Sequence, residues 1–516
     1  MKLPEPHKKT TLDKDLNKFV RLERATAETG QRIVKIGLGI LFLVVVWLIS
    51  IIGYYDIALF PVNENSAFVV AACIIGGYMA LNIGANDVAN NVGPAVGSKA
   101  LTLVGALLIA AIFEAAGALL AGGDVVSTIK NGIIDPTMMP DPDTFIRVML
   151  AALLAAALWL NLATYIGAPV STTHSIVGGV VGAGIAATGL GVVNWSTMFK
   201  IAASWVISPV MGGMVAAAFL AFIKFAIYRT EDMIAAAKRW VPILVAIMAA
   251  AFSIYLVTKG LGKLWKPDSW VVAAIGGVAF VCCYAVVKPA VAHASVQLEK
   301  RRKAVSTLFT IPLICSAALL SFAHGANDVA NAVGPLAAIV DAVASGGIST
   351  QVGVPFWVML VGAVGIGTGL ILFGPKLIRT VGEQITRLDR ARAFCVALSA
   401  AITVIIASAL GLPVSSTHIA VGGVFGVGFL REYLARVQRR AKEKARIAAA
   451  TEGAAAAAGP RASVAWEKQR TKLYKARDRK LVRRTHLTTI VAAWLVTVPL
   501  AGLLAAILFY VFDAFA

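Results

Sequence analysis

Charged side chains are scarce in this chain of 516 residues. Asp, Glu, Lys and Arg make up 14% of it, against 59% hydrophobic residues, and the mean hydropathy is +0.80. About a quarter of the residues of a typical soluble domain are charged. The chain therefore has too little charge to cover a water-facing surface. This excludes an ordinary soluble globular protein and predicts a membrane protein.

Cysteine is also rare, and its placement argues against a disulfide framework. All five cysteines fall inside apolar runs, with no CxxC or Cys/His cluster: Cys73, Cys282, Cys283, Cys315 and Cys395. Thiols in such positions usually serve as small apolar residues. We expect no disulfide, no cysteine-based metal site and no prosthetic cofactor.

A cleavable signal peptide is not indicated either. Residues 1–32 are largely polar, and the apolar run that follows them is too long for the hydrophobic region of a typical signal. We therefore expect residues 33–54 to remain as an extra N-terminal transmembrane helix.

The formal net charge of +20 is concentrated in two segments. Residues 431–485 contain 17 Lys or Arg against 5 Asp or Glu, and residues 1–35 contain 9 against 5. Basic segments beside apolar spans follow the tendency of Lys and Arg to stay on the cytoplasmic side. We predict that both segments are cytoplasmic and contact anionic membrane lipid. We expect no nucleic acid partner.

Apolar runs long enough to cross a bilayer recur along the chain, at about 20 residues for each crossing. They predict an all-α, polytopic protein with about 11–13 transmembrane helices in a cell membrane, such as the bacterial inner membrane. The expected segments are a basic cytoplasmic tail (1–32), the extra helix (33–54), a first repeat (66–228), connecting helices with a polar hinge (229–304), a second repeat (305–430), a basic cytoplasmic loop (431–485) and a final transmembrane helix (486–511).

Two different motifs each occur twice, in the same order. Residues 84–94 read GANDVANNVGP and residues 325–335 read GANDVANAVGP; residues 168–184 and 412–428 share a P-V-S-T/S-T-H segment followed by glycines. Repeated halves with polar, Gly/Pro-interrupted segments at matching positions indicate a transporter whose site lies at the repeat interface. Of the two possible arrangements we expect inverted repeats, which are the commoner.

The GANDVAN motifs place a carboxylate, Asp87 or Asp328, between apolar runs. An intramembrane carboxylate is costly unless it is paired, protonated or bound to a cation. The flanking glycine and proline favour a broken helix with exposed backbone groups. The oxygens suit a monovalent cation such as Na⁺, or a proton carrier; the alternative is a polar patch for helix packing. The candidate Na⁺ ligands are Asn86, Asp87, Asn90, Asn327, Asp328 and Asn331.

The second motif supplies three consecutive hydroxyls after a proline, a pattern typical of a helix N-terminus. Free N–H groups and the helix dipole attract anions there. The two hydroxyl triplets are therefore candidate anion ligands, and ordinary helix capping is the alternative. They are Ser171, Thr172 and Thr173 in the first half and Ser415, Ser416 and Thr417 in the second.

Three further side chains stand out. Glu114 is a lone carboxylate in an apolar run, and we expect it to be buried near the ion site rather than paired with a surface lysine. His174 and His418 follow the hydroxyl triplets directly. They could gate protonation, but we favour neutral hydrogen-bond partners that orient the hydroxyls.

At these residues the sequence resembles the inorganic phosphate transporter (PiT) family of phosphate permeases. The two GANDVAN motifs, the segment IFEAAGALLAGGDVVSTIKNGIIDP and the two PVS(T/S)TH segments match that family's pattern. The resemblance implies an inverted-repeat membrane fold that carries orthophosphate with Na⁺ or H⁺. It also implies that Asp87 and Asp328 contact phosphate or the coupling ion, that the four Asn complete the cation sites, and that Glu114 is functional.

One position departs from the family pattern. Many relatives have an acidic residue in the helix before the second hydroxyl triplet, where this chain has Ala397. We therefore expect the symmetry of the halves to fail there, with Glu114 in the first half and Ala397 in the second.

The function predicted is a symporter that imports inorganic phosphate by alternating access, not an enzyme, and possible homo-oligomers are left open. The nearest rival is a permease for sulfate or another oxyanion on the same fold. A channel is disfavoured by buried paired carboxylates. A membrane-bound phosphatase is disfavoured because no acid/base set with a dedicated nucleophile is visible.

Overall fold

The computed structural model describes residues 11–55, 66–166, 170–262, 265–299, 301–345, 354–380, 388–455 and 484–515. These residues form helices joined by short turns, and no β-strand occurs among them. Eleven helical segments within the described ranges are long and apolar enough to cross a membrane. The predicted all-α, polytopic architecture is confirmed, with a number of spans at the lower end of the expected range.

The first half of the bundle follows a long N-terminal helix, α1 (Thr11–Tyr55). Its helices are α2 (Ser66–Asn86), α3 (Ala89–Gly97), α4 (Leu103–Ala121), α5 (Gly123–Ser127), α6 (Pro142–Ile166), α7 (Thr172–Thr188) and α8 (Trp195–Ile223), with the short π-helical turns η1 (Thr128–Gly132) and η4 (Lys224–Tyr228). Within the predicted basic tail, α1 is already helical from Thr11 onward.

The connecting region contains α9 (Met233–Tyr255), α10 (Ser269–Ala294) and α11 (Arg302–Val305). The second half contains α12 (Thr310–Ser345), α13 (Phe356–Thr380), α14 (Arg390–Ala409), α15 (Ser416–Ala455) and α17 (Arg484–Ala514). Of the predicted basic loop, residues 431–455 continue α15, and residues 456–483 lie outside the described ranges.

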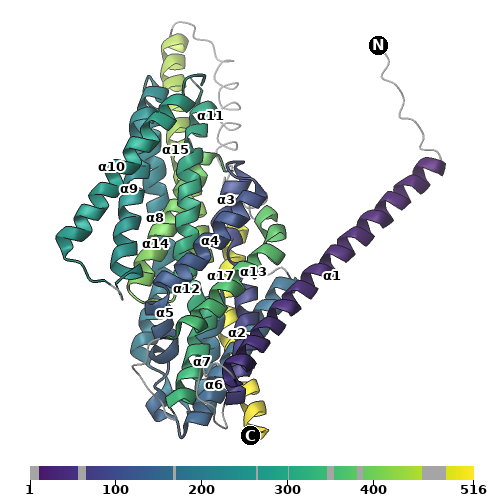
Figure 1. Cartoon of the computed structure of the whole chain (residues 1–516). Coiled ribbons are helices and arrows are strands. Elements are labelled where there is room, and N and C mark those ends of the chain that lie inside the picture. The colour runs from purple at the N-terminus through teal and green to yellow at the C-terminus, as the bar shows by residue number, and fades with distance from the viewer. Residues whose placement is uncertain are drawn as a thin grey trace.

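Two helices begin inside the bundle and lead to opposite ends of it. In Figure 1, α7 lies at the end near the C-terminus, whereas α15 extends past the other end, beyond α11. Both helices start at a hydroxyl triplet, at Thr172 in α7 and at Ser416 in α15. Their N-termini therefore face the interior of the protein.

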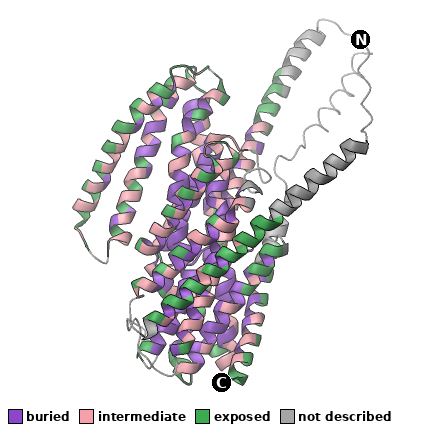
Figure 2. Cartoon of the chain, turned by 45° about the vertical axis from the view of Figure 1, so that its right-hand side comes forward, coloured by how far each residue is buried: buried purple, intermediate pink, exposed green. Residues whose placement is uncertain are grey.

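The helices that surround this centre are the most buried. Figure 2 shows the central helices mostly buried, whereas α1 and α10 expose long apolar faces. Nearly every residue of α12 from Pro312 to Val343 is buried. Exposed side chains such as Ile40, Val281 and Val286 are apolar, as lipid contact requires. The polar residues of both GANDVAN motifs therefore lie in the protein interior and not toward lipid.

Only the first GANDVAN motif interrupts its helix. α2 ends at Asn86 and α3 begins at Ala89, whereas α12 runs unbroken through the second motif. The expected break in α12 is therefore wrong. Pro335 costs that helix one backbone hydrogen bond but does not end it. Gly325 serves a different purpose, because a Cβ there would lie 2.1 Å from the Glu114 carbonyl oxygen of α4.

Glycine contacts relate the two halves residue by residue. Gly325 meets Glu114 of α4, and its counterpart Gly84 meets Ile366 of α13, where a Cβ would lie 1.9 Å from the carbonyl oxygen. In return, Gly117 of α4 meets Phe322, and Gly369 of α13 meets Leu81. Leu81 and Phe322 are themselves equivalent positions before the two motifs. α13 is therefore the counterpart of α4.

The glycines after the hydroxyl triplets make a second set of such contacts. Gly178 and Gly182 of α7 meet the backbone of α17, and Gly422 and Gly426 of α15 meet the backbone of α8. The helix that starts at each triplet thus packs on the last helix of the opposite half. α17, predicted as a separate final helix, occupies the position in the second half that α8 occupies in the first.

Adding a methyl group at Gly369 is expected to destabilise the protein. A Cβ there would lie 2.1 Å from the Leu81 carbonyl oxygen, and a backbone atom cannot turn aside. Overpacking of this kind costs about 1–3 kcal/mol. Gly367, two residues earlier on the same helix, has nothing within 4 Å of an added Cβ. Gly369→Ala should therefore lower the thermal unfolding temperature in detergent clearly more than Gly367→Ala, and equal effects would contradict this packing.

A buried ion pair ties α12 to the turn after α5. Lys130 Nζ of η1 lies 2.9 Å from Asp341 Oδ2 near the end of α12, and the two side chains are only 4% and 8% exposed. In contrast, the Lys259–Asp124 pair at 2.7 Å is 36% and 48% exposed. Removing both charges from water is costly, so the Lys130–Asp341 pair persists only because each ion compensates the other.

Candidate functional site

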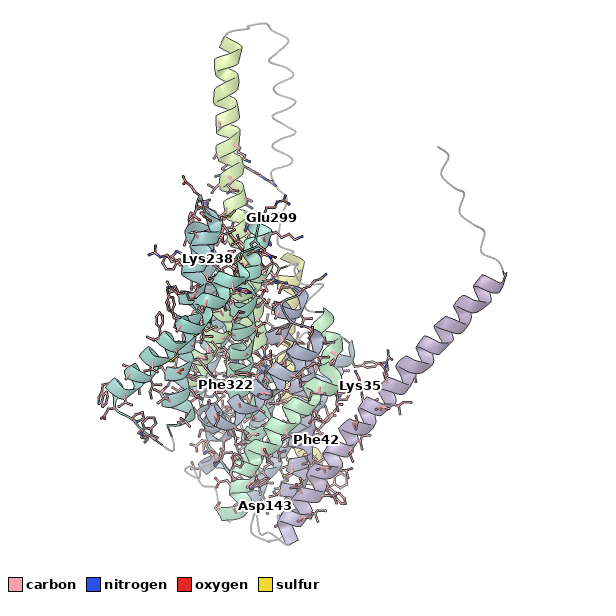
Figure 3. The ribbon with its side chains drawn as sticks, turned by 45° about the horizontal axis from the view of Figure 1, so that its top comes forward. Lys35, Phe42, Asp143, Lys238, Glu299 and Phe322 are labelled. Atoms are coloured by element: carbon pink, nitrogen blue, oxygen red, sulfur yellow. The ribbon has the colours of Figure 1, made fainter. Side chains whose placement is uncertain are left out.

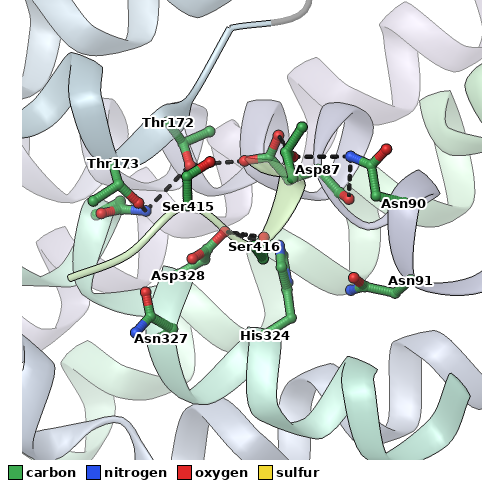
Figure 4. Close-up of polar contacts among 12 residues, drawn as sticks. Asp87, Asn90, Asn91, Thr172, Thr173, His324, Asn327, Asp328, Ser415 and Ser416 are labelled. Carbon is green, nitrogen blue, oxygen red and sulfur yellow. Dashed lines mark hydrogen bonds and ion pairs between the residues drawn. The ribbon is translucent and has the colours of Figure 1, made fainter. Parts of the chain in front are cut away.

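The candidate residues gather in the centre of the bundle, where the N-termini of α7 and α15 meet the α2–α3 junction and α12 (Figure 4). Asn86 and Asn90 are half-buried, and all the other candidates are buried: Asp87, Glu114, Ser171, Thr172, Thr173, Asn327, Asp328, Asn331, Ser415, Ser416 and Thr417. Residues from opposite halves of the sequence thus share one buried region.

Asp87 accepts hydrogen bonds from both hydroxyl triplets. Thr172 Oγ1 donates to Asp87 Oδ2 at 2.7 Å, and Thr417 Oγ1 donates to Asp87 Oδ1 at 3.3 Å. Asn90 Nδ2 donates in turn to Thr417 Oγ1 at 2.9 Å. The first GANDVAN motif is therefore bonded to the hydroxyl triplets of both halves.

The second motif repeats part of this arrangement. Ser416 Oγ donates to Asp328 Oδ2 at 3.4 Å, as Thr172 does to Asp87. Asn331 Nδ2 donates to Thr172 Oγ1 and Thr173 Oγ1, both at 3.2 Å, so it reaches the triplet of the opposite half as Asn90 does. The asparagine bonds cross between the halves, so each half contributes to the polar site of the other.

The first hydroxyl of each triplet caps a helix. Ser171 Oγ accepts from the His174 N–H at 3.2 Å, and Ser415 Oγ accepts from the His418 N–H at 3.4 Å. The alternative of ordinary helix capping therefore applies to these two serines. The second and third hydroxyls are the ones that bond to the motifs.

Asn327 differs from the other motif asparagines. Its Nδ2 donates to Ser408 Oγ at 3.0 Å and to the Leu412 carbonyl at 3.1 Å, and its Oδ1 accepts from the Val414 N–H at 3.2 Å. These bonds hold the segment that leads into the second hydroxyl triplet. Asn327 thus acts on the site through that segment.

Several buried polar atoms at the site have no hydrogen-bond partner among the described residues. They include Asn86 Nδ2, Asp328 Oδ1 and Asn331 Oδ1. Buried polar groups are almost always satisfied, so such a concentration indicates a place for polar ligands. Carboxylate oxygens of Asp87 and Asp328 also lie within 4.8 Å of each other. Their mutual repulsion in a buried site is relieved by a cation or a proton.

Glu114 does not touch the hydroxyl triplets but connects to Asp328 through His324. His324 Nδ1 lies 2.7 Å from Glu114 Oε2, and His324 Nε2 lies 2.8 Å from Asp328 Oδ2. Asn91 Nδ2 donates to the other Glu114 oxygen at 2.7 Å. Sequence reasoning missed His324, although its position four residues before Asp328 on one helix face was a readable signal.

The corresponding positions in the other half are apolar. By the glycine contacts, Glu114 is equivalent to Ile366, and by the repeated motif, Asn91 is equivalent to Ala332 and His324 to Ile83. All three counterparts are buried. The asymmetry was expected between Glu114 and Ala397, but Ala397 lies on α14, whereas the counterpart of α4 is α13. The expectation that Ala397 stands opposite Glu114 is therefore corrected to Ile366.

The two histidines after the triplets lie side by side. The ring centroids of His174 and His418 are 4.8 Å apart, and the His174 ring stacks on Trp205 at 3.8 Å. His174 Nδ1 has no hydrogen-bond partner within the described chain. The His174 side chain therefore packs against rings, and its backbone N–H makes the contact with the hydroxyl triplet.

Comparison with known proteins places the chain in a family. Residues 83–505 match the model of the phosphate transporter family. The chain belongs to the phosphate transporter family. The match begins in α2 and ends in α17, so it spans both halves of the site and leaves out α1.

Relatives from this family are similar over almost the whole chain. A candidate phosphate permease of Helicobacter pylori is 47% identical, over 96% of this chain and 98% of the relative. One of Pyrococcus abyssi is 35% identical, over 86% and 98%. A solved structure of a sodium-dependent phosphate transporter is 34% identical, with a TM-score of 0.75 over 87% of this chain and 100% of that one. Eleven candidate spans and this family identify a multi-pass membrane protein.

Proposed function

We propose that this protein imports inorganic phosphate by secondary active transport, coupled to Na⁺ or H⁺, through alternating access. The observation that carries the proposal is the arrangement at the centre, where Asp87 and Asp328 accept hydrogen bonds from the hydroxyls of two helix N-termini. The carboxylates suit a cation and the helix N-termini suit an anion, and these are the two ions that a phosphate symporter carries together.

Phosphate binding is assigned to the N-termini of α7 and α15. Free backbone N–H groups and the helix dipole favour an anion there, and Thr172, Thr173, Ser416 and Thr417 can donate to it once their hydroxyls turn away from the acceptors that they bond to in this structure. Ser171 and Ser415 shape these N-termini as caps. Phosphate near neutral pH keeps at least one O–H group, which Asp87 or Asp328 accepts.

The same carboxylates separate phosphate from sulfate. Sulfate has no proton to donate, so no hydrogen bond offsets its repulsion by the Asp87 and Asp328 carboxylates. A site built to accept a donor rejects a ligand that lacks one by several kcal/mol. Sulfate permeation is therefore the weaker candidate.

Cation coupling is assigned to both GANDVAN motifs. Asp87 and Asp328 supply charge, and Asn86, Asn90 and Asn331 supply amide oxygens, with Asn327 positioning the segment before Ser415. A bound cation offsets the two carboxylates and so admits the anion. The similar solved structure is of a transporter named as sodium-dependent, and this likeness favours Na⁺ over H⁺.

Alternating access is supported by the way the halves share the site. Because Asn90 and Asn331 each bond to a hydroxyl of the opposite half, a rocking motion of one half would break or form contacts of both motifs together. In Figure 1, α2 and α3 lead toward the α11 end, whereas α12 starts beside α11 and runs back. Opposite directions are what inverted repeats require.

The test is uptake of labelled phosphate by proteoliposomes under one imposed gradient at a time. A Na⁺ gradient alone should drive accumulation if Na⁺ is the coupling ion, and a pH gradient alone if H⁺ is. A tenfold excess of sulfate should leave phosphate uptake nearly unchanged. Downhill flux that neither gradient accelerates, or sulfate uptake equal to that of phosphate, would refute the proposal.

Glu114→Gln is expected to slow phosphate uptake at least about tenfold. Glutamine keeps the shape, but its amide offers one oxygen where Asn91 and His324 both contact the carboxylate. A hydrogen bond to a charged group contributes about 1.5–3 kcal/mol, which corresponds to roughly tenfold or more. Initial uptake rates per reconstituted protein measure the effect. An uptake rate equal to that of the wild type would show that cation-coupled transport does not need Glu114.

A further inference from the structure

A cluster of positive side chains lies at the end of the bundle from which α15 emerges. Lys224 begins the η4 turn and Arg229 follows it, the Arg302 guanidinium lies over the Tyr228 ring of that turn, and Arg392 and Arg431 are on helices that pack on α8. The four arginines come from segments far apart in the sequence: α11, α15, α14 and the residue after η4. We call Lys224 and these four arginines the basic cluster. It is separate from the central site, where the described partners of Asp87 and Asp328 lie.

The carboxylate of Asp389, three residues before Arg392, is already bonded within the first turn of α14. Asp389 Oδ1 accepts from the Arg392 N–H at 3.0 Å and so caps α14, while Asp389 Oδ2 lies 3.1 Å from Arg392 Nη2. Within the described part of the chain, no carboxylate lies at ion-pair distance from Lys224, Arg302 or Arg431. The cluster therefore has a local excess of positive charge.

Three members of the cluster are partly removed from water, whereas Arg229 and Arg302 are exposed. Lys224, Arg392 and Arg431 are half-buried, and the Arg302 guanidinium lies 4.7 Å from the centre of the Tyr228 ring. Lys224 begins the η4 turn that continues α8, and the helices α8, α14 and α15 pack on one another. Like charges gathered in this way repel each other and lose hydration, and both costs fall when an anion binds.

The positive-inside tendency alone does not require positive side chains from different helices to gather in one place. Lys238 of α9 and Lys303 of α11 also lie at this end of the molecule, and both are exposed (Figure 3 labels Lys238). Solvated lysines of that kind satisfy the positive-inside tendency without any ligand.

We propose that the basic cluster is a second anion site, which binds a phosphate group at the membrane surface. Arg229, Arg302 and Arg431 offer planar guanidinium forks that pair with two phosphate oxygens at once, and Lys224 adds a point charge. The phosphate group has two possible sources, the headgroup of an anionic phospholipid and free orthophosphate. Basic pockets between transmembrane helices bind lipid headgroups by this chemistry. The proposal does not rest on the transport function.

The decisive variant is Lys224→Gln/Arg431→Gln, and its matched control is Lys238→Gln/Lys303→Gln, which removes the same charge from the same end. The lipid arm uses the full chain in detergent with phosphatidylcholine and phosphatidylglycerol, and counts retained lipid by native mass spectrometry. The phosphate arm uses phosphatidylcholine alone and measures the thermal shift with added orthophosphate. Arg302→Gln, on the exposed face of α11, repeats both arms in case the double variant does not fold.

For a lipid ligand, the cluster variant should retain phosphatidylglycerol at least about tenfold less strongly than the wild type, with the control unchanged. For orthophosphate, the cluster variant should lose part of the thermal shift that the control keeps; the shift that remains belongs to the central site. Either result supports the proposal and names the source. Equal lipid retention and equal thermal shifts in the wild type, cluster variant, Arg302→Gln and control would overturn it.

Discussion

Asp87→Asn and Asp328→Asn are each expected to lower phosphate uptake by about 100-fold or more. Asparagine fills the same space and can still accept a hydrogen bond from Thr172 or Ser416, so the packing survives. The negative charge that draws the coupling cation is lost, and with it the acceptor for the phosphate O–H group. A loss of about 3 kcal/mol at the transport barrier corresponds to this factor.

Uptake of labelled phosphate into proteoliposomes measures this effect, normalised to the amount of inserted protein. Asp268→Asn is the matched control, because Asp268 is exposed and stands before α10, away from the centre. Insertion and the elution volume in detergent should match the wild type for all three variants. Normal uptake by both Asp87→Asn and Asp328→Asn would remove the two carboxylates from the transport site.

Lys130→Met is expected to cost about 3–5 kcal/mol of stability, because it leaves the Asp341 charge buried without a partner. The double variant Lys130→Met/Asp341→Leu should recover most of the loss, since both buried charges are then gone. Thermal unfolding in detergent compares the three proteins.

The exposed pair provides the control. Lys259→Met removes an ion pair of similar length, but Lys259 and Asp124 remain in contact with water, so the cost should stay below about 1 kcal/mol. If Lys259→Met destabilises the protein as much as Lys130→Met does, burial is not what makes the Lys130–Asp341 pair important.

Much of the site could be predicted from the sequence because repetition marks it. The paired GANDVAN motifs and hydroxyl triplets predicted two carboxylates and two helix N-termini in one place, and the structure brings Asp87, Thr172, Asp328 and Ser416 into contact as pairs. Apolar runs also predicted the spans, because about 20 residues are needed to cross the hydrocarbon whatever the fold.

What the sequence did not predict depends on contacts between helices that share no motif. α4 and α13 have little sequence in common, so their equivalence emerges only from the contacts of Gly84 and Gly325. Without it, Ile366 could not be recognised as the counterpart of Glu114. The continuity of α12 was missed for a related reason, since Gly325 serves close packing and a sequence cannot separate that use from a bend.

The Asn91–Glu114–His324 network, which occurs on one side of the site only, also indicates when the two halves diverged. Two identical polypeptides related by a two-fold axis would contain this network twice or not at all, because every residue of one has an equivalent in the other. Here one copy is polar and the other is Ile83, Ala332 and Ile366. Any symmetric dimeric ancestor must have lacked this difference. The two halves therefore became unequal only once each had its own coding sequence and could mutate separately.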